Sequence, residues 1–251
     1  MNKFTGKSSA YTLSRPGYAK GLFEYLVCDL EVNKQTVIAD IGSGTGKLSQ
    51  DLLKVAGIVY CVEPNDEMRQ VAESLLSNQE GFISVKGTAE QTTLMDKSVD
   101  FILVGQAFHW FDANSFKLEC QRILKETGKV ILIWNSWIRD SEVIMKYHEL
   151  FQMFCPSFKG FSGGLESRKI CEFFENQYEI KRVANHLVFN KESFINRARS
   201  ASYSLIEGDE KFEDYMEVSE KFEKYAVDGI LTMPNETVWY VGKFNKEGVN
   251  E

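Results

Sequence analysis

The chain has 251 residues, of which 43% are hydrophobic and 26% are charged, as expected for a globular protein with a sizeable core. Its formal net charge is −7, whereas a nucleic-acid binder needs a cationic surface to displace the counterions of the phosphates. No apolar run is long enough to cross a bilayer, and Met1–Tyr11 lacks the apolar stretch of a signal peptide. We therefore expect a cytoplasmic protein that acts on a small molecule, with no nucleic-acid or membrane partner.

Cysteine and histidine usage predicts that the protein has no metal centre. The five cysteines are scattered, and no two have the spacing of metal ligands: Cys28, Cys61, Cys120, Cys155 and Cys171. We expect reduced thiols, as in a reducing compartment. The sequence does not set an oligomeric state.

Apolar runs alternate with helical windows from Thr36 to Trp134. Five runs are predicted as strands, over residues 37–41, 58–62, 82–85, 99–104 and 130–134. Helices are predicted over 48–55, over 64–76 with Pro64 in the first turn, and over 115–125, ended by Gly128. Strands that are apolar on both faces indicate a parallel sheet covered by helices, and such sheets bind ligands beyond the carboxyl ends of their strands.

The second half predicts elements added to the same domain, since no clear linker is found. Helices are predicted over 141–154, 165–176, 193–205 and 209–225, and strands over 178–189 and 237–244. We therefore predict a single domain over 1–251. It has a core at about 30–136, helical lid elements at about 137–165 and 190–230, and a final strand at about 236–244.

A glycine-rich turn follows the first strand, with the sequence Asp40-Ile41-Gly42-Ser43-Gly44-Thr45-Gly46. Glycines let the backbone turn tightly and approach a ligand. A phosphate-binding P-loop does not fit, because Ile41 occupies its first glycine position and Leu48 stands where Ser or Thr is required. The dinucleotide fingerprint does not fit either, because Lys47 replaces its last glycine.

Three further strand ends carry polar or glycine-containing segments. Glu63 ends the second strand, and its carboxylate can accept both hydroxyls of a ribose. Segment 87–90 (Gly-Thr-Ala-Glu) follows the third strand, and segment 105–112 (Gly-Gln-Ala-Phe-His-Trp-Phe-Asp) follows the fourth. All four segments are expected on one rim of one sheet.

With these motifs, Tyr11 to Trp134 resembles the class I S-adenosylmethionine-dependent methyltransferases of the type 11 subgroup. Segment 106–112, the run Tyr11-x-x-x-Arg15-Pro16-x-Tyr18 and segment 199–203 are similar to a narrower branch. That branch includes trans-aconitate-like and fungal stress-linked small-molecule methyltransferases. The resemblance implies an α/β, Rossmann-like fold with a seven-stranded, mostly parallel sheet, helices on both faces, helical lid insertions, and S-adenosylmethionine as cofactor.

The resemblance also implies a role for each matching residue. The methionine part of the cofactor faces Asp40, Gly42, Ser43, Gly44, Thr45 and Gly46. The ribose is held by Glu63, and the adenosine lies beside Pro64, Asn65 and Met68. The adenine lies beside Thr88, Ala89 and Glu90. The side near the transferred methyl is lined by Gln106 and Ala107, and an N-terminal segment carrying Tyr11, Arg15 and Tyr18 closes the pocket.

Several alternatives stay open at this stage. His109 is either a general base or a packed residue that anchors its loop. The phenylalanines between Phe151 and Phe161 either form an aromatic lid or simply pack in a core. The absence of an Asn/Asp-Pro-Pro-Tyr motif favours an oxygen acceptor, hydroxyl or carboxylate, and a carboxylate would need a cation from among Arg139, Arg168, Arg197 and Arg199. Two rival functions are a non-catalytic methyltransferase-like binding protein and an NAD-type oxidoreductase.

Overall fold

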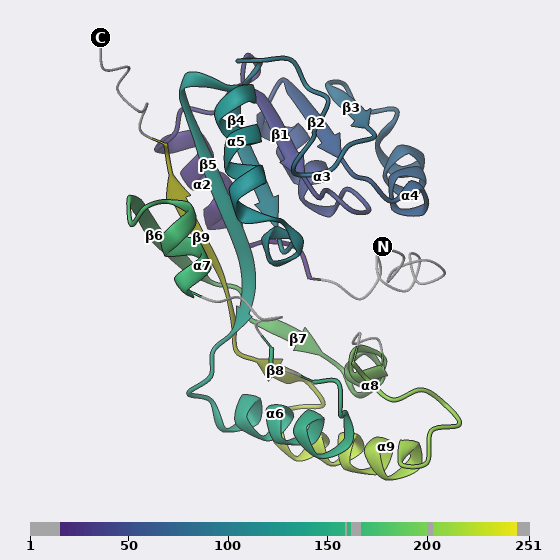
Figure 1. Ribbon diagram of the computed structural model, residues 1–251. Helices are drawn as coiled ribbons and strands as arrows, with labels where there is room; N and C mark the ends of the chain where they lie inside the picture. The colour runs from purple at the N-terminus through teal and green to yellow at the C-terminus, as the bar shows by residue number, and fades with distance from the viewer. Residues whose placement is uncertain (1–15, 159, 162–166, 200–202, 245–251) are drawn as a thin grey trace.

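A computed structural model describes residues 16–158, 160–161, 167–199 and 203–244 (Figure 1). Tyr11 and Arg15 lie outside the described residues. The centre is a seven-stranded sheet with the order β3-β2-β1-β4-β5-β9-β6. Its strands are β1 (Val37–Ile41), β2 (Ile58–Val62), β3 (Phe82–Val85), β4 (Val99–Gly105), β5 (Leu124–Trp137), β6 (Tyr178–Ala184) and β9 (Asn235–Gly242).

The sheet is mostly parallel, as predicted. Strands β1 to β5 pair in parallel, and β9 is inserted antiparallel between β5 and β6. Helices cover both faces, because successive residues of a strand point to opposite sides. Ile131 of β5 packs in one core cluster, with Leu22 of α2 (Lys20–Cys28) and Leu52 of α3 (Lys47–Val55). The next residue along, Leu132, packs in the other cluster with helices α5 (Ala113–Ile123) and α7 (Ser167–Phe173).

The helices predicted in the core differ from the observed ones by one or two residues at their ends: α3 begins at Lys47, α4 begins at Asp66, and α5 spans Ala113–Ile123. Helix α4 spans Asp66–Leu76, because the Asn65 side chain accepts a hydrogen bond from the Met68 amide and acts as the N-cap. Pro64 therefore precedes the helix and is not in its first turn. Helix α5 ends at Ile123, and Gly128 lies within β5, where a Cβ atom would come within 2.9 Å of the Asp100 carbonyl oxygen.

Strand β5 and its partner β9 extend beyond the rest of the sheet. The pairing of β5 with β4 ends at Ile133 opposite Gly105, whereas the pairing with β9 continues to Trp137 opposite Asn235. In Figure 1 these two strands run down to a separate group of elements, which we call the appended subdomain. It contains α6 (Glu142–Phe154), β7 (Leu187–Phe189), α8 (Lys191–Arg199), α9 (Phe212–Glu220), the 3₁₀ helix η2 (Lys221–Tyr225) and β8 (Leu231–Met233).

The appended subdomain corrects several predicted elements. The single strand predicted over 178–189 is wrong, because it divides into β6 in the main sheet and β7, which pairs with β8 in a second sheet. The helix predicted over 193–205 begins earlier, at Lys191, and residues 203–205 are not helical. The helix predicted over 209–225 is α9 followed by the 3₁₀ turn η2. Strand β8 and helix α2 are not foreseen at all. None of the described helices is both long and apolar enough to span a membrane.

Candidate functional site

The four segments predicted to form the site lie at one rim of the sheet. Strands β3, β2, β1 and β4 are neighbours and parallel, so their carboxyl ends meet at the same edge. The loop after β1 crosses to β2, since the amides of Gly42 and Ser43 both donate to the Val62 carbonyl, at 2.9 and 3.2 Å. The sequence prediction that these segments share an edge is therefore confirmed by the sheet order.

The glycine loop after β1 uses backbone conformations that only glycine adopts readily. Gly42, Gly44 and Gly46 have φ angles of +70°, +56° and +80°. A Cβ atom on Gly42 would lie 2.8 Å from the Cβ of Ala107, and one on Gly46 would lie 2.7 Å from the Leu76 side chain. At Gly44 the nearest neighbour of a Cβ would be the Met68 sulfur, at 3.8 Å. The middle of the loop is thus the point that faces open space.

Glu63 joins the loops after β1 and β2. Its Oε2 accepts the amide of Gly44 and its Oε1 accepts the amide of Asn65, each at 2.9 Å. The side chain is buried, which raises the pKa of Glu63, while the two backbone amides and Arg69 act in the opposite direction. A carboxylate has about four acceptor positions, so about two remain after these bonds.

Asp40 is directed into the protein instead of toward the rim. Its carboxylate is 1% exposed and accepts a hydrogen bond from the Ser49 hydroxyl of α3 at 2.5 Å, and the Cys61 thiol lies 3.0 Å from that hydroxyl. Burial raises the pKa of Asp40 to about 7. The side chain therefore fastens α3 to β1 at the base of the glycine loop. Two other loop residues are buried, Thr45 and Ser43, and the Ser43 Oγ has no hydrogen-bond partner among the described residues.

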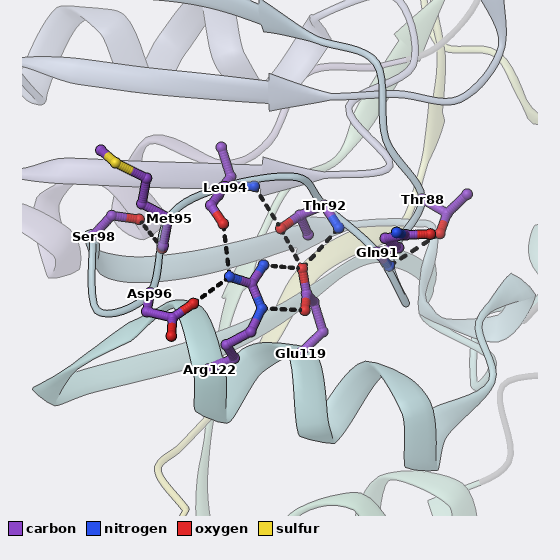
Figure 2. A network of polar contacts seen from close by, with 9 residues as sticks. All are labelled: Thr88, Gln91, Thr92, Leu94, Met95, Asp96, Ser98, Glu119 and Arg122. Carbon is purple, nitrogen blue, oxygen red and sulfur yellow. Dashed lines mark hydrogen bonds and ion pairs between the residues drawn. The ribbon is translucent and has the colours of Figure 1, made fainter.

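The loop after β3 is fixed to helix α5 by a network of charged and polar groups, shown in Figure 2. The Arg122 guanidinium donates to both carboxylate oxygens of Glu119 and also to Asp96. Glu119 in turn accepts from the amide and the hydroxyl of Thr92. Although burial opposes it, these bonds lower the pKa of Glu119. The network restrains the end of the loop that carries residues 88–90.

The predicted residues of this loop have different surroundings. The exposed Thr88 accepts the Gln91 amide through its hydroxyl at 3.1 Å, and Ala89 is buried. Glu90 lies in a segment without a helix, residues 86–98. Its Oε1 accepts the amide of Asp112 at 3.0 Å, and Asp112 is the N-cap of α5. Glu90 therefore links the loop after β3 to the loop after β4.

The loop after β4 closes over the glycine loop. Gln106 has a φ angle of +59°, and its side-chain amide donates to the Asn135 carbonyl at 3.2 Å. Non-glycine residues with such φ values are concentrated at functional sites. Ala107 and Phe111 pack against Gly42. His109, in the 3₁₀ helix η1 (Phe108–Trp110), has its ring 4.7 Å from the Trp110 ring.

Two more residues hold this rim: Lys169, which the sequence prediction missed, and Tyr18, which it placed on the N-terminal segment that closes the pocket. Lys169 of α7 donates to the Phe111 carbonyl at 2.6 Å and to the Phe108 carbonyl at 3.4 Å. Lys169 is 58 positions from Phe111 in the sequence, so no local pattern could have indicated the contact. Tyr18 approaches the end of β4 so closely that a Cβ on Gly105 would lie 2.4 Å from its hydroxyl. Gly105 allows this approach.

The aromatic residues of the appended subdomain form its own core. Phe151 is fully buried, and Phe154, Phe158 and Phe161 belong to the same cluster, together with Tyr147. The packing interpretation of these residues is therefore the one that the structure supports. Of the four arginines considered for a carboxylate, Arg139 and Arg199 are exposed, and Arg168 is exposed and pairs with Glu172 at 2.7 Å. Arg197 is half-buried on α8, near enough for its charge to act on Tyr147.

Comparisons with known proteins agree with this geometry. Residues 39–132, from β1 into β5, match the family model of a methyltransferase domain. An uncharacterized methyltransferase of Mycobacterium tuberculosis strain H37Rv is 34% identical over 143 residues, which are 55% of this chain and 56% of the relative. An uncharacterized methyltransferase-like protein of Schizosaccharomyces pombe is 28% identical over 210 residues, covering 78% of this chain and 79% of the relative. The chain thus spans little more than half the length of the first of these relatives.

The same fold occurs in a solved structure that is named as a methyltransferase. A candidate type II methyltransferase of Anaeromyxobacter dehalogenans superposes with a TM-score of 0.64 over 91% of this chain and 95% of its own, at 20% identity. Fold, rim and domain match agree: residues 39–132 resemble a methyltransferase domain, and 91% of the chain shares the fold of a solved methyltransferase structure. More particularly, its matched segment, residues 39–132, contains the glycine loop, Glu63 and the loops after β3 and β4.

Proposed function

We propose that the protein transfers a methyl group from S-adenosylmethionine to an oxygen atom of a small-molecule acceptor. The observation that carries the proposal is the bond between Glu63 and the Gly44 amide, which joins the acidic end of β2 to the open middle of the glycine loop. An acidic residue and a glycine loop at adjacent strand ends form the arrangement with which α/β sheets bind a nucleoside. We also propose that the protein belongs to the trans-aconitate-methyltransferase-like branch, because segment 106–112 is similar to that branch.

The residues at the rim fit the cofactor. Glu63 keeps acceptor positions for the two ribose hydroxyls, and the buried Ser43 hydroxyl is a polar group that a ligand at this rim would satisfy. Gly44 leaves room for the backbone to approach the ligand. The adenosine would lie beside Pro64, Asn65 and Ala89, and the methionine part beside Gly42, Gly46, Gln106 and Ala107. Asp40, Thr45, Met68, Thr88 and Glu90 would support these contacts, with Tyr11 and Arg15 contributing from the N-terminal segment.

The bound cofactor supplies an activated methyl group on a sulfonium, so the protein's main task is to align the acceptor with it. A hydroxyl acceptor must lose a proton, and His109, on the loop after β4, is the candidate base. A carboxylate acceptor is already ionised at neutral pH and needs a cation. Arg197 suits this role best among the four arginines considered, because it is half-buried beside the aromatic cluster of the appended subdomain.

The appended subdomain is the proposed acceptor lid. It is attached to the sheet through β5 and β9, whose paired ends extend beyond the carboxyl end of β4. Substrate closure by such an element excludes water from the reacting groups. The acidic net charge of −7 favours a small organic acceptor over nucleic acid.

Calorimetric titration with S-adenosylhomocysteine and with NAD tests the cofactor. We expect saturable binding of S-adenosylhomocysteine and none of NAD. Glu63→Ala should weaken binding by about 1.5–3 kcal/mol, as for a lost hydrogen bond to a charged group. Glu217→Ala is the matched control, because Glu217 is an exposed glutamate on α9 whose ion-pair partner is Lys221, at 2.9 Å. Binding of NAD alone, or equal affinity in Glu63→Ala and the wild type, would contradict the assignment.

Incubation with labelled S-adenosylmethionine and pooled metabolites tests the acceptor. Label should appear in small acids or alcohols. Transfer to RNA, DNA or protein with none to small molecules would overturn the acceptor class. Cofactor binding without transfer to any acceptor would instead favour a non-catalytic binding protein.

A further inference from the structure

A group of polar side chains joins the main sheet to the appended subdomain. Asn135 lies on β5, Thr237 on β9 and Asn185 in the turn between β6 and β7, and we call these three the junction cluster. The Thr237 hydroxyl donates to Asn135 Oδ1 at 2.6 Å. The Asn185 side-chain amide lies 3.2 Å from Asn135 Oδ1 and 3.1 Å from Thr237 Oγ1. The three residues are 50 to 102 positions apart in the sequence and meet only in the fold.

The junction cluster also holds the segment that enters the fold before α2. The side-chain amides of Asn135 and Asn185 both donate to the Gly17 carbonyl, at 3.1 and 2.9 Å. The Ala19 amide donates to Thr237 Oγ1 at 2.9 Å. The Thr237 hydroxyl accepts from Ala19 and donates to Asn135, while the two hydrogens of the Asn185 side-chain amide lie near three acceptors: the Gly17 carbonyl, Asn135 Oδ1 and Thr237 Oγ1. Thr237 is fully buried and Asn135 and Asn185 are half-buried, and side chains joined in one hydrogen-bond network restrain one another.

The cluster reaches the rim of the candidate site through β5. The Gln106 side chain donates to the Asn135 carbonyl, and the Gln106 amide donates to the Ile133 carbonyl at 2.9 Å. The positive φ angle of Gln106 is a strained conformation that persists only when its surroundings fix it. These two bonds fix it to the same stretch of β5 that carries Asn135. Tyr18, the residue after Gly17, packs against the end of β4 from the other side.

The cluster also reaches the appended subdomain. The Asn185 amide donates to the Asn235 carbonyl at 2.7 Å, and the Asn235 amide donates to His186 Nδ1 at 3.3 Å. Asn185 and His186 form the turn where the chain passes from β6 in the main sheet to β7 in the second sheet. One asparagine therefore contacts the entering segment, the β5 and β9 strands and the passage to the appended subdomain.

We propose that Asn185 is a positioning residue for cofactor binding: through the junction cluster it holds the Gly17–Ala19 segment and the Gln106 loop in place relative to the appended subdomain. This inference rests on the proposed function. It assigns Asn185 no contact with substrate or cofactor.

Two variants test the role of Asn185. Asn185→Ala removes the side-chain amide, and Asn185→Asp keeps its shape while removing both donated hydrogens. Ser219→Ala is the matched control, because this buried serine in the appended subdomain donates only to the Tyr215 carbonyl at 2.7 Å and lies outside the junction cluster. Each protein is titrated with S-adenosylhomocysteine well below its melting temperature, and amide hydrogen exchange is followed at Ala19 and Gln106.

We expect both Asn185 variants to raise the Kd for S-adenosylhomocysteine at least tenfold and to speed exchange at Ala19 and Gln106. The control should leave both measurements unchanged, whatever its melting temperature. Faster exchange in the Asn185 variants with an unchanged Kd would overturn the inference, because the cluster would then be structural only. Unchanged exchange in the Asn185 variants would overturn the inference as well, whether or not the wild type binds S-adenosylhomocysteine. A wild type that binds no S-adenosylhomocysteine would instead refute the proposed function.

Discussion

The three loop glycines differ in a way that predicts different outcomes for the same substitution. All three have positive φ angles, so replacement by alanine places a Cβ in a conformation that is unfavourable by about 1–2 kcal/mol. At Gly46 the new Cβ would also lie 2.7 Å from Leu76 Cδ1 and 3.3 Å from Ala72 Cβ. Leu76 is 1% exposed, so its side chain is enclosed by neighbouring residues. Overpacking of this kind destabilises by about 1–3 kcal/mol more.

We therefore expect Gly46→Ala to lower the free energy of unfolding by about 2–5 kcal/mol, the sum of strain and overpacking. Gly44→Ala should lower it by only about 1–2 kcal/mol, because its Cβ meets nothing closer than 3.8 Å. Gly229→Ala is a control outside the loop, with a φ angle of +75° and no atom within 4 Å of its Cβ. Gly44→Ala should instead lose affinity for S-adenosylhomocysteine, since its Cβ points into the open side of the loop.

Urea denaturation followed by tryptophan fluorescence measures the stabilities, and calorimetry measures the affinities. Equal destabilisation by Gly46→Ala and Gly44→Ala would refute the packing argument. Gly44→Ala with the wild-type affinity would show that the open side of the loop is not where the cofactor binds.

Three further changes test the surroundings of the site. Asp40 has a folded-state pKa of about 7, above its unfolded value, so its ionisation favours unfolding as the pH rises from about 4 to 7. Asp40→Asn should therefore remove up to about 4 kcal/mol of this pH dependence of the unfolding free energy, as measured by urea titrations. Parallel curves for the variant and the wild type would contradict the burial argument. Arg122→Met should lower the free energy of unfolding by about 1.5–3 kcal/mol at pH 7. The loss should be smaller below pH 4, because the lowered pKa of Glu119 contributes stability that disappears as the pH falls. An equal loss at pH 3 and pH 7 would show that the ion pair is not responsible. Lys169→Met should reduce methyl transfer at least tenfold with little change in S-adenosylhomocysteine affinity, because the Phe111 carbonyl, two residues from His109, loses its hydrogen bond. Lys169→Arg should restore part of the activity. Full turnover by Lys169→Met would show that Lys169 does not position this loop.

The sequence by itself determined the parallel core of the sheet and the edge of it on which the candidate site lies. Strands that are buried on both faces must be apolar along their whole length, so β1, β2 and β4 could be recognised from letters alone. The spacing of Gly42, Gly44 and Gly46 is also local, because a turn in the left-handed region favours glycine whatever lies around it.

Only the tertiary structure decided the groups that meet across the chain. Asp40 turns inward because Ser49 lies beneath it, and Lys169 reaches the Phe111 carbonyl from 58 positions away. The predicted strand over 178–189 failed for a similar reason: its two halves pair with different partners, β9 and β8. Local periodicity records which face of an element is apolar. It carries no record of which distant strand or carbonyl will satisfy that element's hydrogen bonds, because those partners come together only when the whole chain packs.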